Sequence, residues 1–313
     1  MTVTASVANA LILDQMELDD QKTPAAVVDE ILRQNPEVQY PFPLEELAGL
    51  AGIESIGELD TAGFEGMLIT NAEKSRGAIM VKAKTSPRRR RFTIAHELGH
   101  YLLPWHRQET FSCKSSDIKD SGDGRPRSDL INIEAEANSF ASQLLMPSGA
   151  FNRLMHDYGA PELIDITDLS NTFDVSFEAA AHRYKALTEH PVAFVFSYQN
   201  IVRYWVKSQP MPYALKIRKD MPLPLASPSR RAGEYISDWE SVAGHIWLEQ
   251  HADLRLPKNI LEQTLYQSAG YKVTLLQLDS LFGFEDEIEL QQLDDIQQHS
   301  SMDGIDPEYD ESP

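Results

Sequence analysis

Residues 86–104 read SPRRRRFTIAHELGHYLLP, and the fold of the first half of the chain is inferred outward from this stretch. Ser86 followed by Pro87 is typical of a helix start, because serine caps the first turn and proline suits its first position. Pro104 is expected to end the helix, since proline lacks the backbone N–H that a helix interior needs. The sequence therefore predicts one helix from Ser86-Pro87 to about Leu103.

Two histidines, His96 and His100, are four residues apart within this predicted helix. Side chains at i and i+4 lie on the same helix face, so both imidazoles can reach one metal ion. Glu97 is turned away by about 100°, which favours contact with a bound water over contact with the ion. We interpret His96 and His100 as zinc ligands, and Glu97 as the base that takes a proton from the attacking water. The alternative is an exposed amphipathic helix in which the two histidines have no function.

A third ligand is expected from a second helix, predicted from Asp129 to Met146, because catalytic zinc has three protein ligands and one open position. Glu134 shares a small and apolar face of this helix with Asn138, and a carboxylate on such a face needs a partner. Glu136 points to another side and is expected to be solvated, so geometry favours Glu134 as the ligand. Asn138 is expected to hydrogen-bond one of the ligating histidines.

Composition limits the class of protein. The chain has 313 residues, one cysteine and a net charge of −20. The single cysteine excludes a disulfide framework, and no apolar run is long enough to span a bilayer. The first residues make a poor secretion signal, so we expect a soluble, cytoplasmic protein that does not bind a membrane. A chain this acidic is not expected to bind nucleic acid directly.

The chain is expected to divide near residue 190. Residues 1–23 read as a loose lead-in, 24–190 as the metal-binding domain, 191–284 as a mixed α/β domain, and 285–313 as a disordered tail with eleven acids and no Lys or Arg. The sequence further predicts helices at 24–34, 41–50, 148–158 and 176–187, and strands at 66–69, 78–81, 192–196, 202–206 and 271–278. Residues 106–128 and the proline-rich stretch 210–228 are expected to be irregular.

The arginine run and the single cysteine are not expected to have a special function. The four arginines Arg88 to Arg91 are expected to face solvent or pair with the many acids, rather than to attract phosphate. Cys113 is expected to be an unremarkable free thiol, although a cap on the zinc or a sensor of oxidants is the alternative.

In the two predicted helices that carry His96, His100 and Glu134, the sequence resembles the ImmA/IrrE family of metallo-endopeptidases. The likeness lies in residues 89–100, 134–147 and 174–176, covers about 24–190, and continues weakly in 260–263 and 270–276. The resemblance implies an α+β, zincin-like core and a peptide-bond hydrolase with one Zn2+ per chain, held by His96, His100 and Glu134, with Glu97 catalytic. It also implies a substrate, namely a helix-turn-helix repressor of stress-response or mobile-element genes, encoded nearby on a separate chain.

Three further expectations concern the mechanism. Tyr101 and His182 are the candidates for a donor that stabilises the transition state, although a packed core role is the commoner one for each. A substrate peptide is expected to lie extended beside the 78–81 strand. The alternative function is a zinc-containing binding module, of the antitoxin type, that sequesters a partner without cleaving it.

Overall fold

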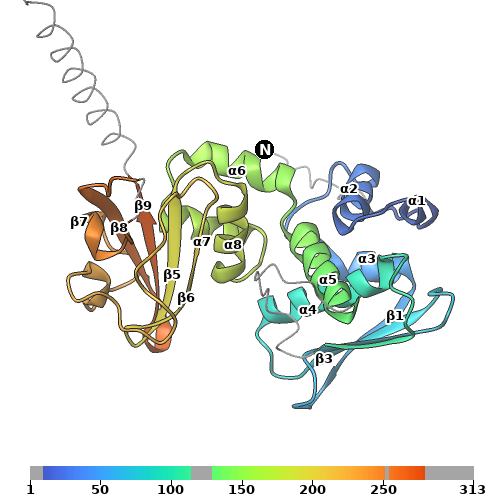
Figure 1. The fold of residues 1–313 in the computed structure, drawn as a ribbon. Coiled ribbons are helices and arrows are strands. Elements are labelled where there is room, and N and C mark those ends of the chain that lie inside the picture. Colours follow the sequence, from blue (N-terminus) through green and yellow to red (C-terminus); the bar gives the residue numbers. More distant parts are fainter. Residues whose placement is uncertain (1–9, 114–128, 251–253, 279–313) are drawn as a thin grey trace, which may run out of the picture. The chain divides into compact units, whose positions relative to one another are not determined.

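The computed structural model describes residues 10–113, 129–250 and 254–278 (Figure 1). The chain divides into two compact units, Met1–Leu187 and Thr188–Pro313. The acidic stretch 285–313, predicted to be disordered, lies outside the described residues. No helix in the described ranges combines the length and the apolar character needed to cross a membrane.

The first unit is mainly helical, and its helices begin where the sequence offers caps. Thr23 Oγ1 accepts a hydrogen bond from Ala26 N at 3.2 Å, and Ser86 Oγ accepts one from Arg89 N at 3.4 Å, each with proline at the next position. The eight helices described in this unit are α1 (Met16–Asp19), α2 (Pro24–Gln34), α3 (Leu44–Ala51), α4 (Pro87–Leu102), α5 (Asp129–Leu145), α6 (Ser148–Tyr158), α7 (Leu163–Thr172) and α8 (Phe177–Leu187).

A four-stranded sheet, ordered β1-β3-β2-β4, completes this unit. Its strands are β1 (Ile53–Leu59), β2 (Gly66–Thr70), β3 (Gly77–Lys82) and β4 (Thr110–Cys113). Strand β3 pairs with β1 on one side and β2 on the other. A substrate cannot add beside residues 78–81, so that prediction is wrong. Strand β4 was not predicted at all, because it lies inside the stretch 106–128 that reads as irregular.

Helices α4 and α5 cross closely, as Figure 1 shows, and one glycine permits the approach. A Cβ added to Gly99 would lie 3.1 Å from a ring carbon of Phe140 and 3.2 Å from Cα of Ala137, both on α5. Residues 93–102 of α4 are all buried, so this helix is surrounded rather than amphipathic. Helix α4 therefore lies in the interior of its unit.

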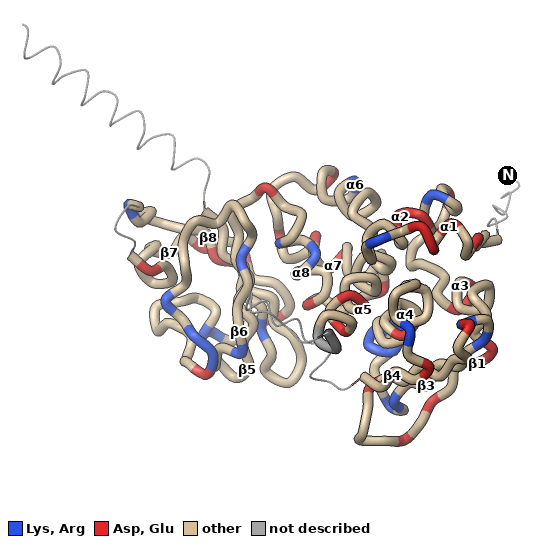
Figure 2. Tube along the Cα trace, turned by 45° about the vertical axis from the view of Figure 1, so that its right-hand side comes forward, with Lys and Arg blue, Asp and Glu red and all other residues tan. Residues whose placement is uncertain are grey.

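The arginine run at the start of α4 pairs with acids, as expected. The ion pairs join Arg88 and Arg91 to Asp174, Arg89 to Glu65, and Arg90 to Glu45 and Glu58, with N···O distances of 3.2–3.9 Å. Basic and acidic positions are interspersed in this unit (Figure 2). Each arginine of the run is partly buried and paired with an acid, and the more exposed of these ion pairs each contribute about 0–1 kcal/mol.

The second unit is β-rich, with an antiparallel five-stranded sheet ordered β6-β5-β9-β8-β7. Its strands are β5 (Val192–Tyr198), β6 (Ile201–Lys207), β7 (Glu240–Ala243), β8 (Asn259–Tyr266) and β9 (Tyr271–Gln277). Among its described residues the only helices are three-residue 3-10 turns. The proline-rich stretch 210–228 crosses one face of the sheet, where Met211, Leu215 and Leu223 are buried against Val195 and Leu276.

A buried carboxylate, Glu262 on β8, lies inside this second unit. Its Oε1 accepts hydrogen bonds from Ser227 Oγ at 2.7 Å and Ser229 N at 2.9 Å, and its Oε2 accepts one from Trp247 Nε1 at 2.7 Å. Three donors compensate for the loss of water around the carboxylate. Glu262 therefore connects the proline-rich crossing to the sheet.

Candidate metal centre

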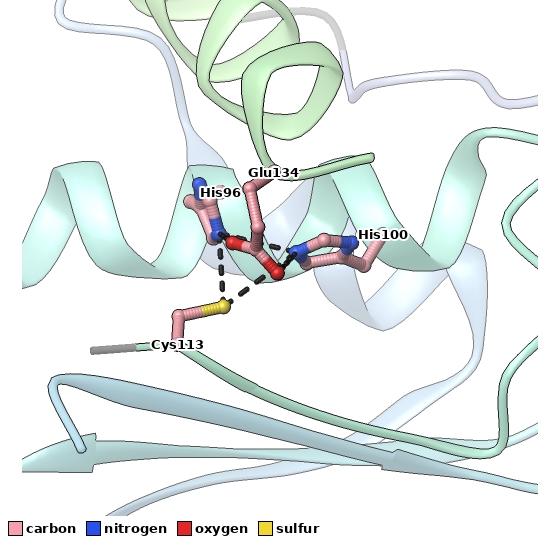
Figure 3. Close-up of side chains that lie close together, drawn as sticks. All are labelled: His96, His100, Cys113 and Glu134. Atoms are coloured by element: carbon pink, nitrogen blue, oxygen red, sulfur yellow. Dashed lines mark hydrogen bonds and ion pairs between the residues drawn. The ribbon is translucent and has the colours of Figure 1, made fainter. Parts of the chain in front are cut away.

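Four side chains from three elements meet between α4, α5 and β4: His96, His100, Glu134 and Cys113 (Figure 3). The Nε2 atoms of the two histidines are 3.1 Å apart. Glu134 Oε2 lies 3.2 Å from His96 Nε2, and Oε1 lies 3.6 Å from His100 Nε2. Cys113 Sγ lies 3.0 Å from His96 Nε2 and 3.5 Å from His100 Nε2. The structure thus brings the three predicted ligands together and adds a fourth group, the thiol.

The distances among the two histidines and Glu134 fit a tetrahedral metal ion, whereas the 3.0 Å between His96 Nε2 and Cys113 Sγ is shorter than a bound zinc ion would set. Zinc bonds to nitrogen at about 2.0–2.1 Å and to sulfur at about 2.3 Å, which puts nitrogens about 3.3 Å apart and nitrogen about 3.6 Å from sulfur. Without an ion, the cluster would leave Glu134 Oε2 buried and outside hydrogen-bonding geometry, although it lies near His96. The donor set, two imidazoles, one carboxylate and one thiol, is one that zinc accepts. The four residues can therefore hold a metal.

The protonation of the cluster also suits a metal. Burial lowers the pKa of His100 to about 4, so its imidazole is neutral and its lone pair is available. Burial alone would raise the pKa of Glu134, but the nearby imidazoles of His100 and His96 outweigh that effect and hold the pKa low. His96 Nδ1 lies 3.0 Å from Asn138 Oδ1, which leaves Nε2 to face the ion. Asn138 thus lies where it was predicted to orient a histidine.

Glu97 lies next to the cluster without belonging to the four residues. It is fully buried, and among the described residues neither of its carboxylate oxygens has a hydrogen-bond partner. Burial raises its pKa to about 7. A buried and unpartnered carboxylate is costly, and a water held beside the metal would satisfy it. A carboxyl group with a pKa near 7 is also well suited to exchange protons at neutral pH.

Cys113 was expected to be an unremarkable thiol, and its position shows otherwise. It is the last residue of β4, and the β2–β4 ladder places it opposite Gly66. Burial, followed by the nearby charge of Glu97, raises the pKa of the thiol when no metal is present. No local pattern indicated this contact, because Cys113 follows His100 by thirteen residues through a turn and a strand that sequence reasoning did not find.

The two candidate transition-state donors do not join the four-residue cluster. The Tyr101 hydroxyl donates a hydrogen bond to the backbone oxygen of Lys74 at 2.6 Å, so this hydroxyl has a structural role. His182 lies on α8 and is half-buried.

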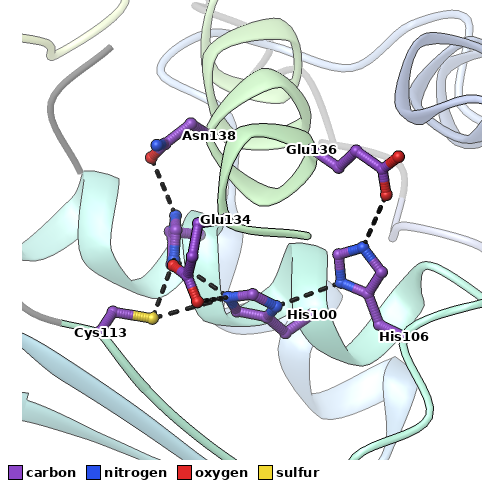
Figure 4. A network of polar contacts seen from close by, with 7 residues as sticks. His100, His106, Cys113, Glu134, Glu136 and Asn138 are labelled. Atoms are coloured by element: carbon purple, nitrogen blue, oxygen red, sulfur yellow. Dashed lines mark hydrogen bonds and ion pairs between the residues drawn. The ribbon is translucent and has the colours of Figure 1, made fainter. Parts of the chain in front are cut away.

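Sequence reasoning also missed His106 and misjudged Glu136. His106 is buried, and its Nδ1 lies 3.1 Å from His100 Nδ1, while its Nε2 lies 2.9 Å from Glu136 Oε2 (Figure 4). Glu136 also accepts a hydrogen bond from Trp105 Nε1 at 2.5 Å. It is therefore partnered rather than merely solvated.

Two crossed helices that bring a His-Glu-Leu-Gly-His segment and a carboxylate together beside a small sheet define a zincin-like fold with a candidate metal centre. Residues 57–185 match the sequence profile of Peptidase_M78, the IrrE N-terminal-like domain. This match over residues 57–185 confirms the resemblance to the ImmA/IrrE family that was inferred from the motifs.

Two curated relatives are both named "Radiation response metalloprotease IrrE". The one from Deinococcus radiodurans is 27% identical over 122 residues, and the one from Deinococcus deserti is 30% identical over 116 residues. The matches cover 39% and 37% of this chain and 35% and 38% of the relatives, so the chain spans little more than a third of either relative. A solved structure described as a Mycobacterium tuberculosis transcriptional regulator covers 82% of this chain and 88% of its own, at 19% identity and a TM-score of 0.47. A likeness that weak supports no inference.

Proposed function

We propose that the chain is a zinc-dependent endopeptidase that cleaves a regulatory protein, a helix-turn-helix repressor encoded nearby. The observation that carries this proposal is Glu97, a buried carboxylate without a hydrogen-bond partner, beside a cluster with metal-ligand spacing. A metal site with only a structural role has no use for such a group. The name of the two Deinococcus relatives supports the same class of activity.

His96, His100 and Glu134 would hold the ion. Bound zinc would supply Lewis acidity, which polarises the scissile carbonyl and makes a water easier to deprotonate. Glu97 accepts the proton of the attacking water and then donates it to the nitrogen of the leaving amine. Asn138 keeps the ring of His96 in place during both steps. His182 stays the candidate for a group that stabilises the transition state.

Strand β4 offers a place for the substrate. Among the described strands it pairs only with β2, so its other edge carries backbone groups that can bind an extended peptide. This strand also ends at Cys113, beside the ligand atoms, so a peptide added to β4 would run past the metal position. The proposed substrate-binding edge is therefore that of β4 and not that of β3.

A second function is favoured by one observation, the position of Cys113. A zinc ion with two histidines, one glutamate and one thiolate has no open position, as in sites with a structural role. Such a chain would bind its partner without cleaving it. In the proposed endopeptidase, by contrast, the thiol must leave the ion before substrate enters.

The experiment combines the purified chain with the repressor encoded beside its gene, with and without a chelator, and identifies fragments by mass spectrometry. We expect zinc-dependent cleavage by the wild-type chain and none by Glu97→Gln, which retains one zinc ion. Cleavage by Glu97→Gln at the wild-type rate would refute the role of Glu97. Tight binding without fragments, in both wild type and Cys113→Ala, would establish the sequestering module instead.

A further inference from the structure

The two histidines of the centre have different partners on the side away from the metal position. His96 Nδ1 contacts a neutral amide, Asn138 Oδ1, at 3.0 Å. His100 Nδ1 contacts a third imidazole, His106 Nδ1, at 3.1 Å, and His106 Nε2 contacts a carboxylate, Glu136 Oε2, at 2.9 Å. Figure 4 shows these contacts as one continuous chain from Glu134 to Glu136. The partner of one ligand is thus an amide, and the partner of the other leads through an imidazole to a carboxylate.

The order of protons along this chain follows from the geometry. His100 Nε2 faces the other ligand atoms, at 3.1 Å from His96 Nε2 and 3.6 Å from Glu134 Oε1, and it must carry the lone pair when it binds a metal ion. A neutral imidazole holds one N–H, and that of His100 is therefore on Nδ1 and is donated to His106 Nδ1. His106 then holds its own proton on Nε2 and donates it to Glu136 Oε2.

The surroundings keep both rings in this arrangement. The ring of His100 stacks on Phe111 of β4, with centroids 4.2 Å apart and an interplanar angle of 18°. His106 is fully buried in the turn that follows α4, where its N–H bonds to Leu103 O at 3.1 Å. Trp105 Nε1 donates to the same oxygen of Glu136 as His106 does, at 2.5 Å. Neighbouring contacts therefore fix the imidazole and the carboxylate independently of the metal.

We propose that His106 and Glu136 are positioning residues of the metal centre, which fix the ring and tautomer of His100 and strengthen its bond to the ion. A carboxylate at the end of such a chain increases electron density on the ligating nitrogen. This inference rests on the proposed metal site but not on peptide hydrolysis. It goes beyond the ligand set, because neither residue offers an atom to the ion.

The test measures the zinc dissociation constant by competition with a chromophoric chelator, together with the visible spectrum of the Co2+-loaded chain. Removal of such a partner typically weakens metal binding by about 10- to 100-fold. We expect that loss in His106→Ala and in Glu136→Ala, with an altered Co2+ spectrum in both. Glu136→Gln keeps an acceptor for His106 and is expected to recover part of the affinity. His156→Ala and Glu37→Gln, both at exposed positions, are the matched controls and should bind zinc as wild type does.

A double-mutant cycle distinguishes positioning from a general effect on folding. In His106→Asn, the amide oxygen can still accept from His100 Nδ1, but the link to Glu136 is cut. We therefore expect Glu136→Ala to cause no further loss of zinc affinity in the His106→Asn background. A persisting tenfold loss there, or zinc binding by His106→Ala within twofold of wild type, would overturn the inference. Absence of repressor cleavage would count against the proposed function alone, because every readout here is metal binding.

Discussion

Gly66 of β2 lies directly against Glu97 of α4: a Cβ at residue 66 would stand 2.3 Å from Glu97 Oε1 and 2.5 Å from Thr93 Cγ2. The strand therefore leaves space for the carboxylate only because residue 66 lacks a side chain. Gly66→Ala is expected to displace Glu97 while the metal ligands stay in place. Misplacement of a catalytic group by about 1 Å can cost roughly 100-fold in rate.

The measurement for Gly66→Ala is repressor cleavage at equal zinc content, together with the free energy of unfolding, which should fall by about 1–3 kcal/mol. Gly49→Ala is the control, because a Cβ there meets nothing within 4 Å. That variant should cleave normally and gain about 0.5–1 kcal/mol in stability, since Gly49 lies within α3. Full activity in Gly66→Ala would show that Glu97 does not need its observed position.

Cys113 is the chain's single cysteine, so its contact with the metal can be followed without interference. If Sγ occupies the fourth position, the Co2+-loaded wild type should show a thiolate-to-cobalt charge-transfer band that Cys113→Ala lacks. We also expect faster basal cleavage in Cys113→Ala, because the fourth position is then open to water. The band should be insensitive to Glu97→Gln. An identical spectrum in wild type and Cys113→Ala would exclude the thiol as a ligand.

Removal of zinc is expected to destabilise the first unit. A ligand present at about 100 times its dissociation constant stabilises the folded state by about 2.7 kcal/mol, which corresponds to a melting temperature about 5–10 °C higher for a unit of this size. Calorimetry with and without a chelator should show this shift in wild type and in His156→Ala. The shift should vanish in His96→Ala and Glu134→Ala. A shift that survives in Glu134→Ala would remove this residue from the ligand set.

Glu262→Gln is expected to destabilise the second unit by about 1–3 kcal/mol, because all three groups around this carboxylate are donors. The glutamine side chain has an NH2 group in place of one carboxylate oxygen, so four donors would share a single acceptor oxygen and one donor would have no acceptor. Denaturant unfolding measures the loss, with Glu234→Gln at an exposed position as the control. Equal stability of the two variants would show that the buried carboxylate is dispensable.

The same residue predicts a pH dependence. Burial raises the pKa of Glu262 in spite of its three donors, so the folded state holds the proton more tightly than the unfolded state does. Its contribution to stability is therefore complete below the unfolded pKa of about 4.3 and is lost as pH rises through the folded pKa. The stability advantage of wild type over Glu262→Gln should shrink from pH 4 upward. The difference between wild type and Glu234→Gln should stay constant over that range.

Tyr101 and His182 are expected to differ in their effect on cleavage. The Tyr101 hydroxyl already donates to Lys74 O, so Tyr101→Phe should leave the rate within about twofold of wild type. As a donor to the transition state, His182 is expected to lower the rate by about 100- to 1000-fold when replaced in His182→Ala, at unchanged zinc content. A normal rate in His182→Ala would remove it from the site.

Much of the centre was accessible from sequence, because its key spacings are local. His96 and His100 are one helical turn apart, and Glu134 and Asn138 are one turn apart on a second helix, so helix geometry alone relates each pair. The caps at Thr23 and Ser86 likewise predicted two helix starts. Local patterns thus predict where a helix begins and which of its side chains share one face.

The rest depends on contacts between distant segments. Strand β1 was missed because Glu54, Gly57 and Glu58 weaken its strand signal, and β4 because it is four residues long within a polar stretch. Without β4, nothing relates Cys113 to the histidines. The contact between His106 and Glu136 joins residues 30 apart in sequence, and no periodicity links them.

Helix α5 provides Glu134 to the ion, Asn138 to His96, and Glu136 to His106, all within two turns. A shift of α5 by one residue in register would turn the position of each side chain by about 100° around the helix axis and break all three contacts together. In the proposed function, separation of α5 from α4 would therefore release the metal and end cleavage at the same time.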